Sequence, residues 1–167
     1  CHNHDSSWIH LEVPDISVYR LVEPLSSCAP ILSSPVVIKI KNTGTDPIFK
    51  DVTINMGYQL NNEAPVLTDY VLTSNFAAGD SLQCTLPGTV SMPNYGTYQL
   101  KVFVYLKNDS IRENDTLNKI VTVFVPPTVN LGNDLTLDDI AEYVLDAGAG
   151  FKSYIWQLLF CHTRNIF

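Results

Sequence analysis

The sequence has little charge, and its 10 Lys and Arg are outnumbered by its 17 Asp and Glu. Only 16% of its 167 residues are Asp, Glu, Lys or Arg, and the net charge at pH 7 is −7. A basic stripe is the usual footprint of nucleic-acid binding, and positive charge draws proteins to anionic membranes. The composition therefore predicts neither kind of partner. Abundant Val, Thr and Tyr with low charge are typical of an all-β extracellular domain.

Histidine is missing from most of the chain. The four histidines stand near the two ends, at His2, His4, His10 and His162. Residues 11–161 therefore contain no base for a Ser-His-Asp or Cys-His device. Paired carboxylates can work without histidine, but the acidic residues here stand mostly at predicted turns, where solvated and capping roles are usual. We therefore expect a protein that is not an enzyme.

Long apolar runs and paired cysteine motifs are also missing. No run approaches the roughly 20 apolar residues of a membrane-spanning helix, so we expect no membrane insertion. The four cysteines form no CxxC motif, which argues against structural zinc. Cys28 and Cys84 are a candidate disulfide, worth about 4 kcal/mol in the chain-entropy model. The alternative is two unpaired, small apolar core residues.

What the sequence does have is a series of short alternating runs between Asp15 and Val125. In one run Val36, Ile38 and Ile40 share a face, and elsewhere Leu100 and Val102 do so. No segment shows a helical period. The spacing predicts seven strands, over residues 15–22, 35–42, 51–58, 65–72, 81–86, 94–106 and 115–125. The predicted fold is an immunoglobulin/fibronectin III-like antiparallel β-sandwich.

Two prolines after Val125 mark a boundary, because proline cannot continue a central ladder. We expect one complete domain over residues 15–126. Residues 1–14 would be a linker or the tail of a preceding domain. Residues 127–167 would begin a second β unit, with Trp156 as its core residue, that is too short to be complete. Because the chain does not begin with Met, we expect an excised part of a longer protein.

Three aromatic residues are candidates for specific roles. Tyr98 precedes the inward-facing Leu100 by two positions, as in a tyrosine corner; the alternative is a half-buried strand tyrosine. Phe103 and Tyr105 point away from the core face of their strand. Exposed aromatics on a sheet stack on sugars or anchor a partner, although a neighbouring domain could equally cover them.

Two segments suggest metal binding at first sight. "CHNH", from Cys1 to His4, has ligands too close together for an established zinc spacing. "LGNDLTLDD" groups acidic side chains and an amide, and calcium requires several oxygen ligands. Its spacing does not match an EF-hand loop, so ordinary loop polarity is the default. We expect no cofactor, with calcium as the alternative at Asn133, Asp134, Asp138 and Asp139.

The motifs "DISV", "IKNTG", "NNEAPV", "GTYQLK" and "NDTL" follow one another between Asp15 and Val125. In that order they resemble the bacterial cell-adhesion-related (CARDB) domains of Bacteroidota surface proteins. The segment after Pro127 resembles the start of an Ig-like or polycystic-kidney-disease-like (PKD-like) repeat. It departs from that pattern at Asp138-Asp139-Ile140, where a cysteine is common, and again after Trp156.

The resemblance implies a spacer or adhesion module of a large cell-surface or secreted protein. Such proteins are often associated with gliding motility or exported by the type IX system. Neighbouring domains, a surface protein or a glycan would be the partners. The resemblance also implies O-glycosylation at Asp-(Ser/Thr)-aliphatic sites, here Ser81, Ser110 and Thr116. The alternative function is a carbohydrate-binding sandwich accessory to a secreted hydrolase, which Phe103 and Tyr105 would favour.

Overall fold

The computed structural model describes residues 13–129 and 148–149. The chain divides into two units, Cys1–Pro126 and Pro127–Phe167, and the seven strands belong to the first. In chain order the strands are β1 (Ile16–Glu23), β2 (Ile31–Asn42), β3 (Thr53–Leu60), β4 (Val66–Val71), β5 (Ser81–Met92), β6 (Gly96–Tyr105) and β7 (Thr116–Val123). A single 3-10 turn, η1 (Arg112–Asn114), precedes β7.

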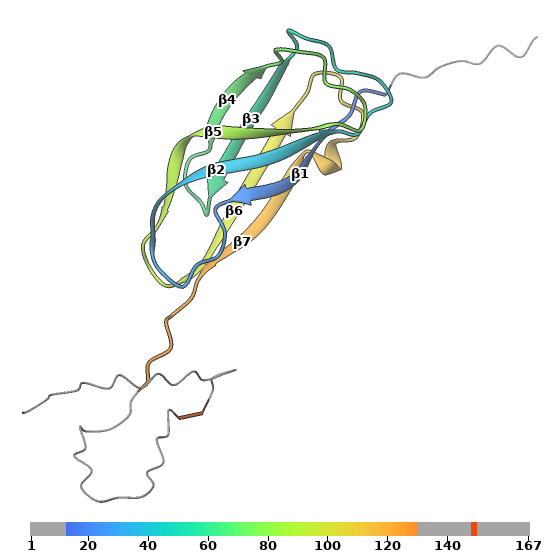
Figure 1. Ribbon diagram of the computed structural model, residues 1–167. Helices are drawn as coiled ribbons and strands as arrows, with labels where there is room; N and C mark the ends of the chain where they lie inside the picture. The colour runs from blue at the N-terminus through green and yellow to red at the C-terminus, as the bar shows by residue number, and fades with distance from the viewer. Residues whose placement is uncertain (1–12, 130–147, 150–167) are drawn as a thin grey trace, which may run out of the picture. The chain divides into compact units, whose positions relative to one another are not determined.

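The strands form two antiparallel sheets that pack face to face (Figure 1). One sheet has the order β1-β2-β5 and the other has the order β4-β3-β6-β7. This arrangement confirms the predicted immunoglobulin/fibronectin III-like sandwich. The fourth strand pairs with β3, not with β5, so the second sheet is the wider one. No helix in the described part of the chain is long and apolar enough to cross a membrane.

The core is built from every second side chain of both sheets, as the alternating pattern predicts. Ile38 and Ile40 on β2 face Leu100 and Val102 on β6, and all four are fully buried. Their neighbours on the same strands, such as Lys39 and Lys101, point outward. Burial of about 25 cal/mol per Å² of apolar surface is the main stabilising term for such a core.

Strands β2 and β5 are longer than the sequence predicts. Pro35 pairs with Thr89 while Val36 pairs with Leu86, so Pro87 and Gly88 are extra residues on β5. Proline is tolerated in a sheet at such a bulge, because the missing N–H is not needed there. The Tyr58 hydroxyl, from the opposite sheet, donates a hydrogen bond to the Pro87 carbonyl at 3.1 Å.

The chain enters and leaves the sandwich at opposite ends. Asp15 lies just before β1, and Asn114 lies just before β7. Asn114 Nδ2 donates a hydrogen bond to Asp15 Oδ1 at 2.9 Å. From there β7 runs for eight residues to Val123, which is about 25 Å at 3.3 Å per residue. Figure 1 shows β1 and β7 beginning at the same end of the sandwich, and the chain leaving β7 at the other.

The predicted second β unit lies almost entirely outside the described residues. So do Trp156, the "CHNH" segment and the acidic segment after Leu131. The two units meet between Pro126 and Pro127, and the predicted extent of the complete domain, residues 15–126, stays a prediction. The roles predicted for residues 1–14 and 127–167 stay predictions.

Candidate functional site

A hollow of about 490 Å³ opens on the outer face of the four-stranded sheet. It lies over β3, β6 and β7, toward the turn that joins β3 to β4. Its lining is mostly polar and rich in carboxamides. The lining residues are Gln59, Asn61, Asn62, Gln99, Leu100, Lys101, Asn118, Lys119 and Ile120.

Strand register brings these residues together. Gln59 pairs with Lys101, which in turn pairs with Asn118, so the three lie in one row across the sheet. Gln99 pairs with Ile120 in the next outward-facing row. Since outward positions repeat every second residue, the sheet presents these side chains side by side. The hollow is therefore a product of pairing between segments that are distant in the sequence.

Two of the carboxamides are held in place by backbone contacts. Gln59 Nε2 donates to the Glu63 carbonyl at 2.8 Å. Asn61 Oδ1 accepts from the Gln99 amide at 2.8 Å, and Asn61 has a positive φ of 49°, which Asn tolerates well. Each contact uses one end of the carboxamide, so Gln59 Oε1 and Asn61 Nδ2 remain for a ligand.

The charge of the hollow is opposite to that of the whole chain. Its lining includes the outward-facing Lys101 and no carboxylate, whereas the chain as a whole carries −7. Lys119 also borders the hollow, but it pairs with the buried Leu100, so its side chain points to the other face of the sheet. The Lys101 ammonium lies 5.9 Å from the centre of the Phe103 ring, within the range of a cation–π contact. The hollow therefore suits a polar ligand that carries negative charge.

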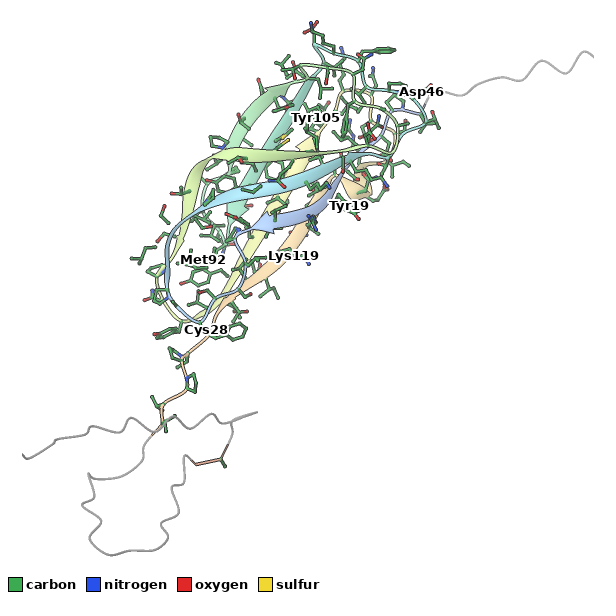
Figure 2. All side chains as sticks on the ribbon, viewed as in Figure 1. Tyr19, Cys28, Asp46, Met92, Tyr105 and Lys119 are labelled. Carbon is green, nitrogen blue, oxygen red and sulfur yellow. The ribbon has the colours of Figure 1, made fainter. Side chains whose placement is uncertain are left out.

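The two predicted ligand-facing aromatics occupy different surroundings. Phe103 is half-buried and lies against Gly57, where an added Cβ would come within 2.7 Å of the ring. It borders the hollow through its neighbour Lys101. Tyr105 is 50% exposed, but the Arg112 guanidinium sits 4.4 Å from its ring centre. Phe103 therefore lies in the outward row next to Lys101, and Tyr105 lies one outward row further, at the end of β6 (Figure 2 labels Tyr105).

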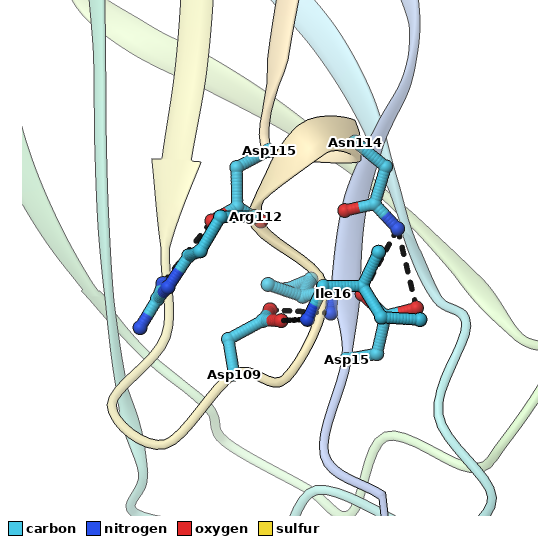
Figure 3. A network of polar contacts seen from close by, with 7 residues as sticks. Asp15, Ile16, Asp109, Arg112, Asn114 and Asp115 are labelled. Atoms are coloured by element: carbon cyan, nitrogen blue, oxygen red, sulfur yellow. Dashed lines mark hydrogen bonds and ion pairs between the residues drawn. The ribbon is translucent and has the colours of Figure 1, made fainter.

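A buried polar network ties β1 to the loop between β6 and β7 (Figure 3). The Ile16 amide donates to Asp109 Oδ2 at 2.9 Å, and the Ile111 amide donates to Asp109 Oδ1 at 2.8 Å. The Ser110 amide donates to the Pro14 carbonyl at 2.9 Å. Asp109 and Asp15 are therefore structural side chains that hold the first strand in the sandwich.

Asp115 belongs to the same network, but one of its carboxylate oxygens lacks a hydrogen-bond partner. Arg112 Nη1 donates to its Oδ2 at 3.1 Å, while Asp115 Oδ1 and the neighbouring Asn114 Oδ1 are buried without a hydrogen-bond partner. Burial raises the pKa of Asp115 above its ordinary value; the hydrogen bond from Arg112 opposes the rise, and the charge of Asp109 adds to it. Across residues 13–129 and 148–149, no group of three or more His, Cys, Asp or Glu side chains could hold a metal ion.

The three candidate glycosylation positions differ in their surroundings. Ser81 follows an exposed Asp80 at the start of β5 and is itself exposed. Ser110 is exposed, but Asp109 before it is buried in the network above. Thr116 is half-buried, and Asp115 before it is also buried. Of the three Asp-Ser/Thr pairs, only Asp80-Ser81 presents both side chains to solvent.

The candidate disulfide is absent, because both Cys28 and Cys84 are free. Cys84 pairs with Ile38 in the middle of the three-stranded sheet, whereas Cys28 lies beyond the far end, before the pairing of Ile31 with Met92 (Figure 2). Seven residues of strand separate Ile31 from Ile38, roughly 20 Å, and a disulfide needs Cα atoms within about 7 Å. The alternative prediction, that the cysteines are unpaired core residues, is correct for Cys84. Burial raises the pKa of its thiol to about 11. Cys28 is exposed.

The tyrosine corner is present. The Tyr98 hydroxyl donates to the Asn94 carbonyl at 3.0 Å and accepts from the Asn94 amide at 3.1 Å. Both contacts reach back four residues, from β6 to the corner that precedes it, as the motif requires. Tyr98 is therefore a structural residue of this corner and not part of the hollow.

The hollow was missed from the sequence, apart from the adjoining Phe103. Its carboxamides are scattered over three strands, so only the strand register reveals that they meet. A weak signal is present in the outward positions of β3 and β6, where the uncharged polar residues Gln59 and Gln99 stand. Sequence alternation alone assigns those positions to solvent without saying what lies beside them.

Comparison with known proteins yields structural likenesses only. No family model matches the chain, and no curated protein matches it. A solution structure of the CARDB domain of a Pyrococcus furiosus protein is similar, at 17% identity and a TM-score of 0.49, covering 70% of this chain and 100% of that domain. A crystal structure of the same domain in complex with di-metal ions gives 13% identity and a TM-score of 0.47, covering 71% and 100%. The fold class itself rests on the strand pairing described above.

Proposed function

We propose that residues 13–126 form a non-catalytic spacer and adhesion module of a larger, extracellular bacterial protein. The observation that carries this proposal is the position of the two chain ends. The chain enters beside Asn114 and leaves after Val123, so a domain attached before this one and a domain attached after it would be held apart by the length of the sandwich.

The contacts at the two ends suit a module under tension. Tension on the ends pulls the start of β1 and the end of β7 in opposite directions along the strands. The Asp109 network resists at the first end. At the other end, the Ser27 amide donates to the Thr122 carbonyl (2.9 Å), and the Phe124 amide donates to the Ser27 carbonyl (2.8 Å). We call these two groups of hydrogen bonds the end clamps. Hydrogen bonds in a sheet run across the strands. Tension along the strands would therefore act on all the hydrogen bonds of one clamp at the same time.

The identity of the larger protein belongs to the proposal as well. The ordered motifs between Asp15 and Val125 support a CARDB-like domain from a Bacteroidota protein, exported by the type IX system or attached to the surface of a gliding cell. The exposed Asp80-Ser81 pair makes Ser81 the preferred position for an O-linked glycan. A PKD-like or Ig-like domain would follow after Pro127.

An antibody against residues 13–126 tests this location. It should label intact, unpermeabilised cells of the source organism, or precipitate the protein from the culture medium. Lysed cells serve as the control for total protein. Labelling that requires lysis would contradict an extracellular module.

A carbohydrate-binding role is the second candidate, and the hollow over β3, β6 and β7 favours it. Carboxamides are common sugar ligands because each supplies both a donor and an acceptor. The half-buried Phe103 lies in the next outward row of β6 after Lys101. The two candidates are compatible, since an adhesion module needs a surface that binds.

A further inference from the structure

We propose that the hollow lined by Gln59, Gln99, Lys101 and Asn118 binds an acidic polysaccharide whose sugar rings carry carboxylates, such as a polyuronate. The inference deepens the carbohydrate-binding candidate above and rests on it. It assigns the negative charge of the ligand and the residues that recognise it. The spacer role does not depend on it.

The charge of the site selects an anionic ligand. Lys101 stands in the middle of the row Gln59–Lys101–Asn118 and is the cation whose side chain faces the hollow. Lys119 pairs with the buried Leu100, so its side chain points to the other face of the sheet. A chain with a net charge of −7 would repel a polyanion from most of its surface, whereas Lys101, in a lining without a carboxylate, makes this face locally favourable. A neutral sugar would form no ion pair with Lys101.

The carboxamides select a ligand with many hydroxyl groups. Gln99 and Asn118 are exposed on the outer face, in adjacent rows, and each offers a donor and an acceptor. The remaining ends of Gln59 and Asn61 add one acceptor and one donor, already oriented by their backbone contacts. Neighbouring hydroxyls on a sugar ring also pair a donor with an acceptor, so the two patterns are complementary.

Apolar surface lies on both sides of this polar row. Ile120, 66% exposed, is on the β7 side, and Phe103 lies one outward row beyond Lys101 on β6. Sugar rings present C–H faces that pack against apolar and aromatic side chains. A saccharide could therefore contact Ile120, the carboxamides and Lys101 at once.

An acidic peptide fits the same charge less well. The floor of the hollow is β6, which is paired on one side with β3 and on the other with β7. Its backbone groups are used in those ladders, so an extended peptide cannot add to the sheet there. Over β6, recognition must therefore come from side chains, as it commonly does for sugars. The edge strand β7 is where a peptide could add to the sheet, and the oligoglutamate probe below tests that alternative.

Isothermal titration of the full chain with short oligogalacturonate tests the proposal. Binding should appear at low salt and weaken as salt is added. Neutral cello-oligosaccharide of the same length should bind at least about tenfold more weakly, because a charged hydrogen bond contributes about 1.5 kcal/mol or more. Oligoglutamate of the same length, the acidic-peptide probe, should also be at least about tenfold weaker.

Two variants locate the site. Lys101→Gln should weaken oligogalacturonate binding by at least about tenfold, and Asn118→Asp should do the same by adding a repelling charge. Lys39→Gln is the matched control, because Lys39 lies at the middle of the central strand of the other sheet. It should leave affinity unchanged.

Four results would each overturn the inference: no binding of oligogalacturonate by the wild type, equal binding of the neutral oligomer, equal binding of oligoglutamate, or equal affinity of Lys101→Gln and wild type. None of these results bears on the end clamps. Failure of the polysaccharide proposal can therefore be distinguished from failure of the spacer proposal.

Discussion

At the scale of single residues, both ends of the sandwich are held by side chains that bond to backbone. Asp109 accepts two amides at the end where the chain enters. Near the other end, Tyr98 bonds both backbone groups of Asn94. Such contacts stabilise turns that have no ladder of their own. The residue-scale predictions follow from removing one functional group at a time.

Removing the Tyr98 hydroxyl should lower stability. Tyr98→Phe keeps the ring but loses the two hydrogen bonds to Asn94, so the free energy of unfolding should fall by about 1–2 kcal/mol. Urea denaturation measures the change. Tyr95→Phe, at the exposed neighbouring tyrosine, should change stability little. A Tyr98→Phe protein as stable as wild type would show that the corner contributes nothing.

Asp115 should make stability depend on pH in the direction opposite to most carboxylates. Its pKa in the folded protein is raised above the ordinary 3.8, so ionisation costs stability. That cost is absent below the unfolded pKa and is complete above the folded pKa. Asp115→Asn cannot ionise, and its amide replaces one of the two buried acceptors without partners, Asp115 Oδ1, by a donor. The variant should therefore be more stable than wild type near pH 7, by about 1 kcal/mol.

The advantage of Asp115→Asn should shrink as the pH falls toward about 4, because wild-type Asp115 then binds its proton. Urea denaturation at the two pH values measures the difference. Glu113→Gln, at the exposed carboxylate in the same turn, is the control. Its difference in stability from wild type should be the same at both pH values. An advantage that grows on acidification would mean that the pKa of Asp115 is lowered by the Arg112 pair.

At the scale of elements, the four-stranded sheet depends on the contact between Gly57 on β3 and the Phe103 ring on β6. The two are register partners. An aromatic ring that covers a glycine restores the packing that the missing side chain would have provided. This contact places the Phe103 ring beside the row that forms the hollow.

Filling that position should be costly. A Cβ on Gly57 would come within 2.6 Å of the Val66 carbonyl oxygen and 2.7 Å of the Phe103 ring. Because the first of these atoms is backbone, β4 would have to shift, and Gly57→Ala should destabilise the protein by about 2 kcal/mol. Thermal or urea unfolding measures this loss. Thr53→Ala, at an exposed position on the same strand, should cost about 0.5 kcal/mol, and equal losses would contradict the close contact.

The elements also show which features can be predicted from sequence. Alternation predicted the buried faces of β2 and β6 correctly, because burial on one face imposes a period of two. It began β2 too late, at Pro35 instead of Ile31, and ended β5 too early, at Leu86 instead of Met92, because proline argues against a ladder unless a bulge accommodates it. Register, which depends on contacts between distant segments, was out of reach. Whether Cys28 and Cys84 can meet depends on register, and the predicted disulfide was wrong. The hollow also depends on register, and the sequence did not predict it.

At the scale of the whole molecule, the account rests on the path of the chain through the sandwich. The end clamps join the start of β1 and the end of β7 to the rest of the fold, and the ends lie about 25 Å apart along β7. A spacer must keep that separation under tension. The clamps predict that resistance to force depends on particular hydrogen bonds and not on stability alone.

Single-molecule pulling of the full chain, with handles at residues 13 and 126, tests this claim most directly. Asp109→Ala removes two acceptors from the first clamp, whereas Tyr58→Phe removes a hydrogen bond between β3 and β5, away from both clamps. Both variants should lower equilibrium stability, by about 1 kcal/mol or more. The account predicts that Asp109→Ala unfolds at a clearly lower force than wild type, while Tyr58→Phe unfolds near the wild-type force. Equal unfolding forces for Asp109→Ala and wild type would contradict it.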